Sequence, residues 1–141
     1  MQKIIIASDH GGYNLKNKII EHLSTKGYNI VDYGCNSLES CDYPYFAQKV
    51  AKAVSNDKEL KGILVCGTGI GMSIAANRFS NIRASLCTDT YTAKMTRKHN
   101  DSNILCLGER VTGIGSALDI VDVWLNTDFE GGRHQKRLDM I

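Results

Sequence analysis

The chain has little proline, a small net charge and no long apolar run. It contains one proline in 141 residues, and 17 basic against 15 acidic residues leave a formal charge of +2. A nucleic-acid-binding protein would usually carry a basic stripe and a far higher charge. No apolar run approaches the length of roughly 20 residues that crosses a bilayer, and the apolar opening 4–7 is too short for a signal-peptide core. We therefore expect a soluble protein without a nucleic-acid or membrane partner.

Paired cysteines at metal-ligand spacing are also absent. The five cysteines are odd in number and contain no C-x-x-C pair: Cys35, Cys41, Cys66, Cys87 and Cys106. Neither a disulfide framework nor a zinc site is indicated, and this cysteine usage suits a reducing cytoplasm. With 43% hydrophobic residues, the chain predicts one domain, 1–141, with a proper core.

Apolar runs of strand length alternate five times with segments of helical period. The expected strands are 3–8, 29–33, 63–66, 83–87 and 103–107, and each is followed by an expected helix, the last two at about 90–98 and 115–125. This alternation predicts an α/β protein with a five-stranded parallel sheet covered by helices on both faces. Ligands of such sheets bind at the carboxyl ends of the strands. The tail, 130–141, is interpreted as an appended C-terminal helical arm.

A thiol and a glycine run follow the third expected strand. Cys66 precedes Gly67-Thr68-Gly69-Ile70-Gly71, which leads into an expected helix. A helix N-terminus presents unpaired N–H groups and a partial positive charge, and glycines let a ligand approach the backbone. The same field favours a thiolate, so Cys66 is a candidate base or nucleophile beside an anion cradle. A buried structural cysteine is the alternative, since Cys87 and Cys106 also lie in apolar runs.

A dinucleotide site is a competing interpretation of the same run. Gly67 and Gly69 begin a G-x-G pattern, and Asp89 follows about twenty residues later, near the usual place of a ribose-binding acid. However, Met72 stands at the third glycine position, and the pattern follows the third strand instead of the first. A G-x-x-x-x-G-K-[ST] run is absent as well, so both nucleotide interpretations are disfavoured.

Arginines in the tail form a candidate phosphate site. Arg133 and Arg137 stand four residues apart and would share one face of a helix. Guanidinium groups bind phosphate oxygens in bidentate fashion. A solvated face, or ion pairs with Glu130 or Asp139, is the alternative. Arg110 is similarly ambiguous.

Polar groups elsewhere also allow two interpretations. Asp9 and His10 follow the first strand, where they could exchange protons with a sugar hydroxyl or serve as a helix cap and a surface histidine. His99 follows the fourth helix and could simply complement its C-terminus. Asp42 and Tyr43 begin a helix with a proline in its first turn, and could also line a pocket.

Six segments together resemble the ribose-5-phosphate isomerase B (RpiB/LacA/LacB) family of sugar-phosphate isomerases. They are 8–12 (SDHGG), 42–44 (DYP), 66–71 (CGTGIG), 75–77 (AAN), 99–101 (HND) and 131–134 (GGRH). Each motif alone is weak, whereas six in the family's order are specific and cover nearly the whole chain. The resemblance implies a Rossmann-like three-layer α/β/α sandwich, a homodimer whose active sites draw on both subunits, and no metal or organic cofactor.

The resemblance also implies roles for single residues. Cys66 resembles the base that moves a proton between C2 and C1 of an open-chain sugar, with Thr68 assisting and the amides of 67–71 stabilising an enediolate. His99 resembles the proton donor that opens the sugar ring, with Asp9 nearby. The implied substrate-binding residues are His10, Asp42, Tyr43, Gly67, Gly69, Ile70, Gly71, Asn100, Arg110, Arg133 and Arg137.

Two positions qualify the resemblance. Some relatives lack the cysteine and carry a glutamate base at the position of Met72, which cannot take a proton, so the cysteine-base branch is indicated. Glu109 stands beside Arg110, and an ion pair between them would put the role of that arginine in doubt.

The implied reaction interconverts ribose 5-phosphate and ribulose 5-phosphate, in the non-oxidative branch of the pentose phosphate pathway. The same chemistry on a six-carbon phosphate, such as allose or galactose 6-phosphate, is an alternative, since only pocket length would differ. A non-catalytic sugar-phosphate sensor is a second alternative, although binding alone requires neither Cys66 nor His99. The sequence leaves dimer and tetramer open.

Overall fold

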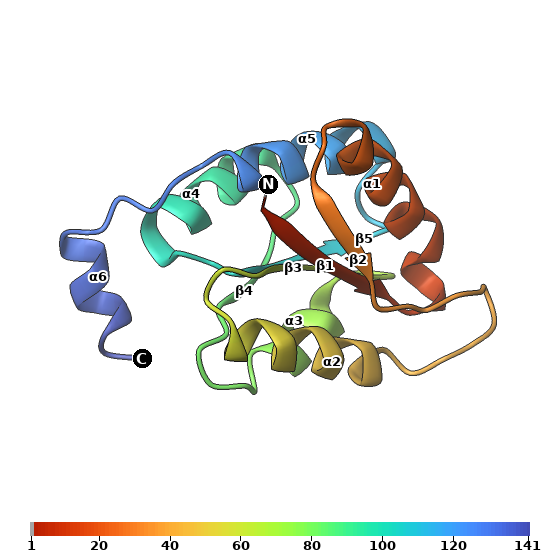
Figure 1. Ribbon diagram of the computed structural model, residues 1–141, viewed down its shortest axis with the longest axis horizontal. Coiled ribbons are helices and arrows are strands. Elements are labelled where there is room, and N and C mark those ends of the chain that lie inside the picture. The colour runs from red at the N-terminus through yellow and green to blue at the C-terminus, as the bar shows by residue number, and fades with distance from the viewer. Residues whose placement is uncertain (1) are drawn as a thin grey trace.

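The computed structural model describes residues 2–141 and places a five-stranded parallel sheet at the centre (Figure 1). The strands are β1 (Lys3–Ser8), β2 (Asn29–Asp32), β3 (Lys61–Cys66), β4 (Ala84–Leu86) and β5 (Ile104–Gly108). They are ordered β2-β1-β3-β5-β4, and every neighbouring pair is parallel. The predicted α/β class and Rossmann-like sheet are confirmed.

Helices cover both faces of this sheet, as the predicted three-layer sandwich requires (Figure 1). On one face lie α1 (Tyr13–Thr25), α4 (Thr90–Asn100) and α5 (Ile114–Leu125). On the other lie α2 (Tyr43–Asn56) and α3 (Ile70–Ala76). A short 3-10 helix, η1 (His10–Gly12), precedes α1, and α6 (Arg133–Leu138) forms the expected C-terminal arm, which packs against α4. Within residues 2–141, no helix combines the length and the apolar content needed to cross a membrane.

Alternation along the strands divides the core between the two faces. Successive side chains of a strand point to opposite sides, so Ile4 and Ile6 of β1 join the cluster under α1 and α5, whereas Ile5 joins the cluster under α2 and α3. In β3, Val65 joins the cluster under α1 and α5, and Cys66 joins the cluster under α2 and α3. The thiol of Cys66 therefore points to the α2/α3 side at the carboxyl end of a central strand.

Four of the five strands differ from the sequence-based expectation by one or two residues, since β2 ends at Asp32 instead of residue 33 and β5 covers Ile104–Gly108 instead of 103–107. The fourth strand, expected at 83–87, covers only Ala84–Leu86, because β4 lies at the sheet edge and pairs with β5 alone. The third strand begins at Lys61 instead of residue 63, since the polar start is paired with β1 through Ile4 and Lys61. These differences move the carboxyl end of an inner strand by one residue at most, from 107 to Gly108 in β5.

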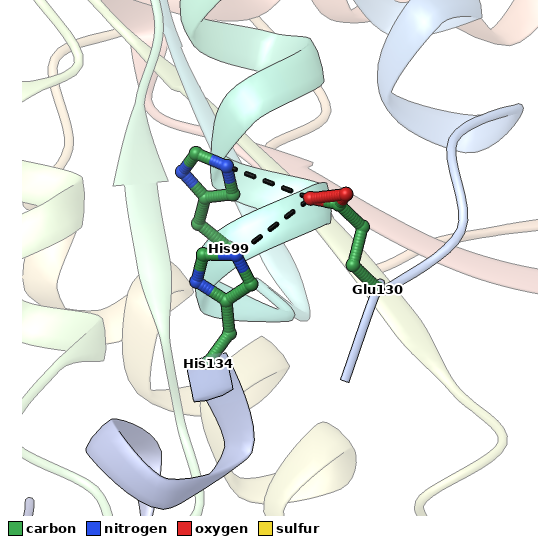
Figure 2. Close-up of side chains that lie close together, drawn as sticks. All are labelled: His99, Glu130 and His134. Carbon is green, nitrogen blue, oxygen red and sulfur yellow. Dashed lines mark ion pairs between the residues drawn. The ribbon is translucent and has the colours of Figure 1, made fainter. Parts of the chain in front are cut away.

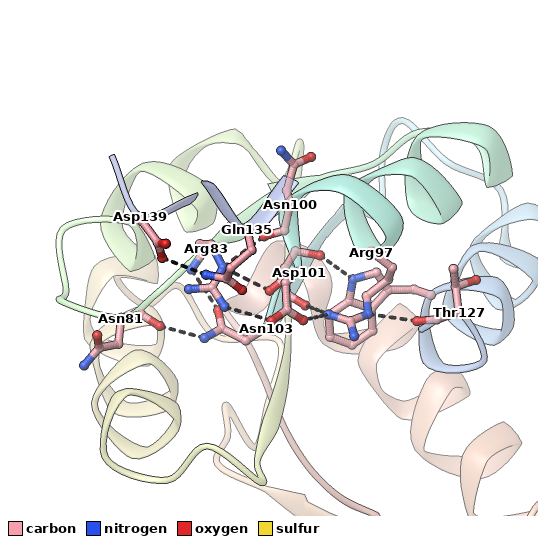
Figure 3. A network of polar contacts seen from close by, with 11 residues as sticks. Asn81, Arg83, Arg97, Asn100, Asp101, Asn103, Thr127, Gln135 and Asp139 are labelled. Carbon is pink, nitrogen blue, oxygen red and sulfur yellow. Dashed lines mark hydrogen bonds and ion pairs between the residues drawn. The ribbon is translucent and has the colours of Figure 1, made fainter. Parts of the chain in front are cut away.

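A buried arginine fixes the end of α4 (Figure 3). Arg97, only 6% exposed, donates from Nη1 to Oδ1 of Asp101 at 2.8 Å and to the carbonyl of Ser102 at 2.6 Å, and from Nε to the carbonyl of Thr127 at 3.1 Å. The last of these bonds ties the segment after α5 to the end of α4. The arm therefore starts from a fixed point beside the last turn of α4.

Candidate active site

The turn from β3 to α3 places the thiol of Cys66 against the backbone. The N–H of Gly69 donates to Sγ of Cys66 at 3.1 Å, and Cys66 is 5% exposed. The sulfur therefore faces a backbone donor at the start of α3. Burial raises the pKa of Cys87 to about 11 and also raises the pKa of Cys106. The thiol of Cys35 donates to the carbonyl of Ser37, whereas the thiol of Cys66 accepts a backbone N–H and lines a cleft.

Close packing explains the glycines of this turn. Gly69 has φ +80°, a left-handed conformation that side chains other than glycine adopt at a cost, and a Cβ there would lie 2.9 Å from the carbonyl carbon of Leu107. A Cβ at Gly71 would lie 2.5 Å from the ring of Tyr43. The glycine run therefore lets β5 and the start of α2 approach the thiol closely.

A cleft of about 470 Å³ opens over this turn, at the carboxyl edge of the sheet. Its lining combines the ends of β1 and β3, the first turn of α3, the first residue of α2 and the loop after β5. The lining residues are Asp9, Tyr43, Cys66, Gly67, Thr68, Ile70, Gly71, Ile74 and Arg110. Of these, only Ile74 was not among the residues proposed from the sequence. The carboxyl-edge rule thus located this cleft correctly.

Asp9 and His10 both take part in local structure at the rim. Oδ1 of Asp9 accepts the N–H of Gly12 at 3.2 Å, so this carboxylate caps η1 and lines the cleft at once. Nδ1 of His10 accepts the N–H of Cys41 at 3.2 Å. Asp42, at the N-cap position of α2, makes no capping hydrogen bond with its side chain. The capping interpretation of Asp9 is correct, and it does not compete with a place in the site.

Glu109 is engaged away from Arg110. Its Oε1 accepts the N–H of Leu15, in the first turn of α1, at 2.6 Å. The guanidinium of Arg110 instead approaches the glycine run, where a Cβ at Gly67 would lie 3.0 Å from Nη1. The ion pair that would have cast doubt on Arg110 is therefore not formed within residues 2–141.

Asp89 serves as the helix cap of α4. Its Oδ1 accepts the N–H of Thr92 at 2.7 Å, and these bonds to Thr92 lower the pKa of the carboxyl group. A capping role explains Asp89 without a bound ribose. This agrees with the expectation that the chain does not bind a dinucleotide.

The remaining proposed residues lie at the opposite edge of the sheet. His99 and Asn100 end α4, which runs antiparallel to the strands, so they lie near the start of β5 and not near its end at Gly108. Arg133 and Arg137 are exposed on α6, which Figure 1 shows beyond this edge. In one chain, Asp9 and His99 therefore lie at opposite edges of the sheet, and the proximity that the resemblance implies would need a second subunit.

A histidine pair that the sequence analysis did not single out, His99 and His134, lies at this opposite edge of the sheet (Figure 2). The rings of His99 and His134 stack with centroids 4.2 Å apart, and Nε2 of each lies near Oε1 of Glu130, at 3.6 and 3.7 Å. Glu130 is therefore not the partner of Arg133 or Arg137. The i,i+4 spacing of Glu130 and His134 was the available signal, but it required the arm to turn back onto α4.

A second hollow, of about 820 Å³, lies under the end of α6. It is lined by Asn77, Phe79, Ser80, Asn81, Ile82, Arg83, Ala84, Ser85, Asn100, Leu138, Asp139 and Ile141. No thiol or imidazole is among these residues. The smaller cleft over Cys66 therefore remains the candidate active site.

Comparisons with known proteins agree with this geometry. Residues 4–141 match the model of a family described as ribose/galactose isomerase. The chain is 48% identical to ribose-5-phosphate isomerase B of Escherichia coli over 141 residues, which cover all of this chain and 95% of the relative. A solved ribose-5-phosphate isomerase B from Clostridium thermocellum is 55% identical, with a TM-score of 0.95 over 98% of this chain and 93% of that one. A solved relative from Mycoplasma genitalium, with bound ribulose-5-phosphate, is 45% identical, with a TM-score of 0.95 over 98% of this chain and 92% of that one. The chain belongs to the ribose/galactose isomerase family.

Proposed function

We propose that this protein is an aldose-ketose isomerase that interconverts D-ribose 5-phosphate and D-ribulose 5-phosphate in the pentose phosphate pathway. The observation that carries the proposal is the thiol of Cys66, bonded to the N–H of Gly69 in the lining of the carboxyl-edge cleft. Relatives that match nearly the full length are named ribose-5-phosphate isomerase B, and one of them holds ribulose-5-phosphate. The names of these relatives and the position of the Cys66 thiol both support isomerisation of a sugar phosphate.

Proton transfer at carbon is the task proposed for Cys66. Its sulfur removes the proton from C2 of the open-chain aldose, and negative charge develops on O1. The O2 hydroxyl proton then moves to O1, for which the Thr68 hydroxyl is placed in the cleft lining. Return of the proton from sulfur to C1 completes the ketose. General base catalysis of this kind contributes roughly 10²- to 10⁴-fold to a rate.

Backbone amides at the start of α3 are proposed to stabilise the developing charge. Two amides of the run have partners within the chain, because Gly69 donates to Cys66 and Ile70 donates to Oγ1 of Thr68. The amides of Gly67, Thr68 and Gly71 are therefore the ones proposed to face a substrate oxygen. Fixed N–H dipoles of this type stabilise an oxyanion without reorganisation.

Ring opening and phosphate binding are proposed to need groups that lie at the amino edge of the sheet. His99 is proposed to protonate the ring oxygen as the C1–O bond breaks, and Asp9 to take the proton of the anomeric hydroxyl. Arg133 and Arg137, with His10 and Arg110, are proposed to bind the phosphate, while Asp42, Tyr43 and Asn100 contact the sugar.

A homodimer with shared active sites is proposed because one chain holds the two groups apart. Cys66 and Asp9 line the carboxyl-edge cleft, whereas His99 and the arm lie beyond the amino edge (Figure 1). A second copy of the chain would bring its arm to the first copy's cleft. The five cysteines are all free, which supports the proposed cytoplasmic location.

The activity assay compares five- and six-carbon substrates. We expect turnover of ribose 5-phosphate and ribulose 5-phosphate, with a higher kcat/KM than for allose or galactose 6-phosphate, because pocket discrimination appears in that ratio. The six-carbon reaction is the second candidate, since the family description includes galactose. A higher kcat/KM for a six-carbon phosphate would replace the proposed substrate, and no turnover of either class would refute the isomerase.

A further inference from the structure

Glu130 and His134 both lie beside His99, the proposed proton donor for ring opening. His99 lies in the last turn of α4, His134 in the first turn of α6, and Glu130 in the segment that leads into α6. Figure 2 shows Nε2 of both histidines directed toward the carboxylate of Glu130. The distances from its Oε1 are 3.6 Å to His99 and 3.7 Å to His134. The carboxylate thus bridges two imidazoles.

The ring orientation does not favour one metal ion between these groups. The three ligand atoms lie within 4.8 Å of one another, which alone would suit a small cation. However, the two rings stack with only 14° between their planes. The lone pairs of an imidazole lie in its ring plane, so those of two nearly parallel stacked rings cannot converge on one ion. The cluster therefore suits protons better than a metal.

Backbone bonds hold the cluster in place. The N–H of Glu130 donates to the carbonyl of Lys98 at 3.1 Å, next to His99. The carbonyl of Thr127, three residues earlier, is held by the buried Arg97. Both contacts fix the start of the arm against α4, so the carboxylate of Glu130 reaches His99 from a restrained backbone.

His134 differs from His99 in its surroundings. Its side chain is 7% exposed against 40% for His99, and its Nε2 is buried without a hydrogen-bond partner in residues 2–141. Burial, followed by the neighbouring His99 and Arg133, lowers the pKa of His134, while Glu130 opposes that shift and Arg137 adds to it. The ring of His134 is therefore held in a buried position, with its face packed against the ring of His99.

We propose that Glu130 and His134 are positioning residues for His99, which rests on the proposed role of His99 in ring opening. The carboxylate holds the proton on Nε2 and stabilises the imidazolium, while the stacked ring fixes the imidazole plane. Nδ1 of His99, which points away from Glu130 in Figure 2, then carries the proton that is given to the sugar ring oxygen. A carboxylate that fixes the tautomer of a catalytic histidine acts in the same way in hydrolase triads.

The contact between His99 and Glu130 contributes little to the folded state, because both side chains are partly exposed. At 3.6 Å, Nε2 of His99 is beyond ordinary hydrogen-bond distance of Oε1. Catalytic hydrogen bonds are often long before the substrate binds and shorten in the complex. The charge on Glu130 should therefore affect turnover more than it affects the folded state.

Glu130→Gln tests the carboxylate, with Glu21→Gln as the matched exposed control. We expect kcat with ribose 5-phosphate to fall about 10-fold or more in Glu130→Gln, and the decline of activity at high pH to begin at lower pH, because the imidazolium loses its stabilising charge. The control should keep the wild-type rate and pH profile. Wild-type rate and an unshifted profile in Glu130→Gln would overturn the proposal.

Hydrogen exchange separates ring opening from the Cys66 step. Ribulose 5-phosphate in D₂O exchanges a C1 proton through the enediolate, and this exchange does not involve the sugar ring. We expect Glu130→Gln to keep that exchange while net conversion to ribose 5-phosphate falls, so that the ratio of exchange to conversion rises. A parallel loss of both would show a general structural role instead. A wild-type protein without exchange or conversion would refute the proposed function itself, which makes the two failures distinguishable.

Substitutions at His134 test the stacking. His134→Phe keeps an aromatic face and should retain kcat within about threefold, whereas His134→Leu removes the face and should lower kcat by the same order as Glu130→Gln. Thermal unfolding of both variants controls for folding. If His134→Phe lowers kcat as much as His134→Leu while both variants remain folded, the imidazole acts through its nitrogens and the stacking role is wrong.

Discussion

The cleft over Cys66 and the cluster around His99 are built in different ways. Backbone geometry makes the cleft: the Gly69 amide bonds the thiol, and neighbouring strands leave no room for a side chain at the turn. Side chains make the cluster, on a six-residue helix that packs against α4. The cleft contains the proposed base, Cys66, without the arm, whereas the opposite edge carries the imidazoles and the exposed arginines of α6 without that thiol. Each half is chemically incomplete, which is the physical reason to expect a second chain.

Removal of the thiol is the change expected to affect the cleft most. Cys66→Ala deletes the only group proposed to move the carbon-bound proton, so kcat should fall by about 10³-fold or more. Affinity for ribose 5-phosphate should stay within a few-fold, because the proposed phosphate ligands are untouched. Steady-state kinetics and calorimetric titration measure the two quantities.

The matched control for that variant is Cys87→Ala. Cys87 is also a buried core thiol, and its raised pKa keeps it protonated at neutral pH. We expect a small loss of stability with nearly unchanged kcat. Full activity in Cys66→Ala would remove this thiol as the base and would leave the cleft without a catalyst.

The contrast between the backbone-built cleft and the side-chain cluster around His99 also explains which features the sequence predicted well. The parallel sheet, its flanking helices and the polar carboxyl edge follow from local period and from the strand-end rule, which act within one chain. The capping role of Asp9 was one of two interpretations, and the structure shows that capping and cleft lining occur together. Strand ends shifted by one or two residues because pairing with neighbours, not hydrophobicity, sets them.

The second edge could not be predicted in this way. His99 was expected near Asp9 from the resemblance, which also implies sites shared between subunits, and no pattern in the sequence shows that one chain keeps the two residues at opposite edges. Stacking of His134 on His99 depends on the arm turning back, which Arg97 and the Lys98 carbonyl arrange through contacts distant in sequence. Such contacts leave no periodic pattern in the sequence.

Mixing two inactive variants tests whether the two regions meet across a subunit boundary. Cys66→Ala and His99→Asn dimers, after exchange of subunits, should regain about a quarter of wild-type activity, because half of the dimers are mixed and one of their two sites is intact. Activity before and after mixing is the measurement. Mixing Cys66→Ala with the Cys66→Ala/His99→Asn double variant should restore nothing, which serves as the control. No recovery in the first mixture, despite demonstrated subunit exchange, would mean that one chain supplies both groups.

The smallest expected effect concerns Glu109, where the cleft meets α1. Its carboxylate accepts the Leu15 N–H at the positive end of α1, so Glu109→Gln keeps an acceptor but loses a charge that is worth about 0.3 to 1 kcal/mol. We expect the free energy of unfolding in urea to fall by about that amount, and kcat/KM to stay within about twofold, because Arg110 does not depend on this carboxylate. Glu21→Gln, at an exposed position inside α1 and away from its first turn, should change neither quantity by a comparable amount. A KM increase of about tenfold or more in Glu109→Gln, without a larger loss of stability, would show that Glu109 organises Arg110 after all, and the cleft would then depend on side-chain contacts as much as the arm does.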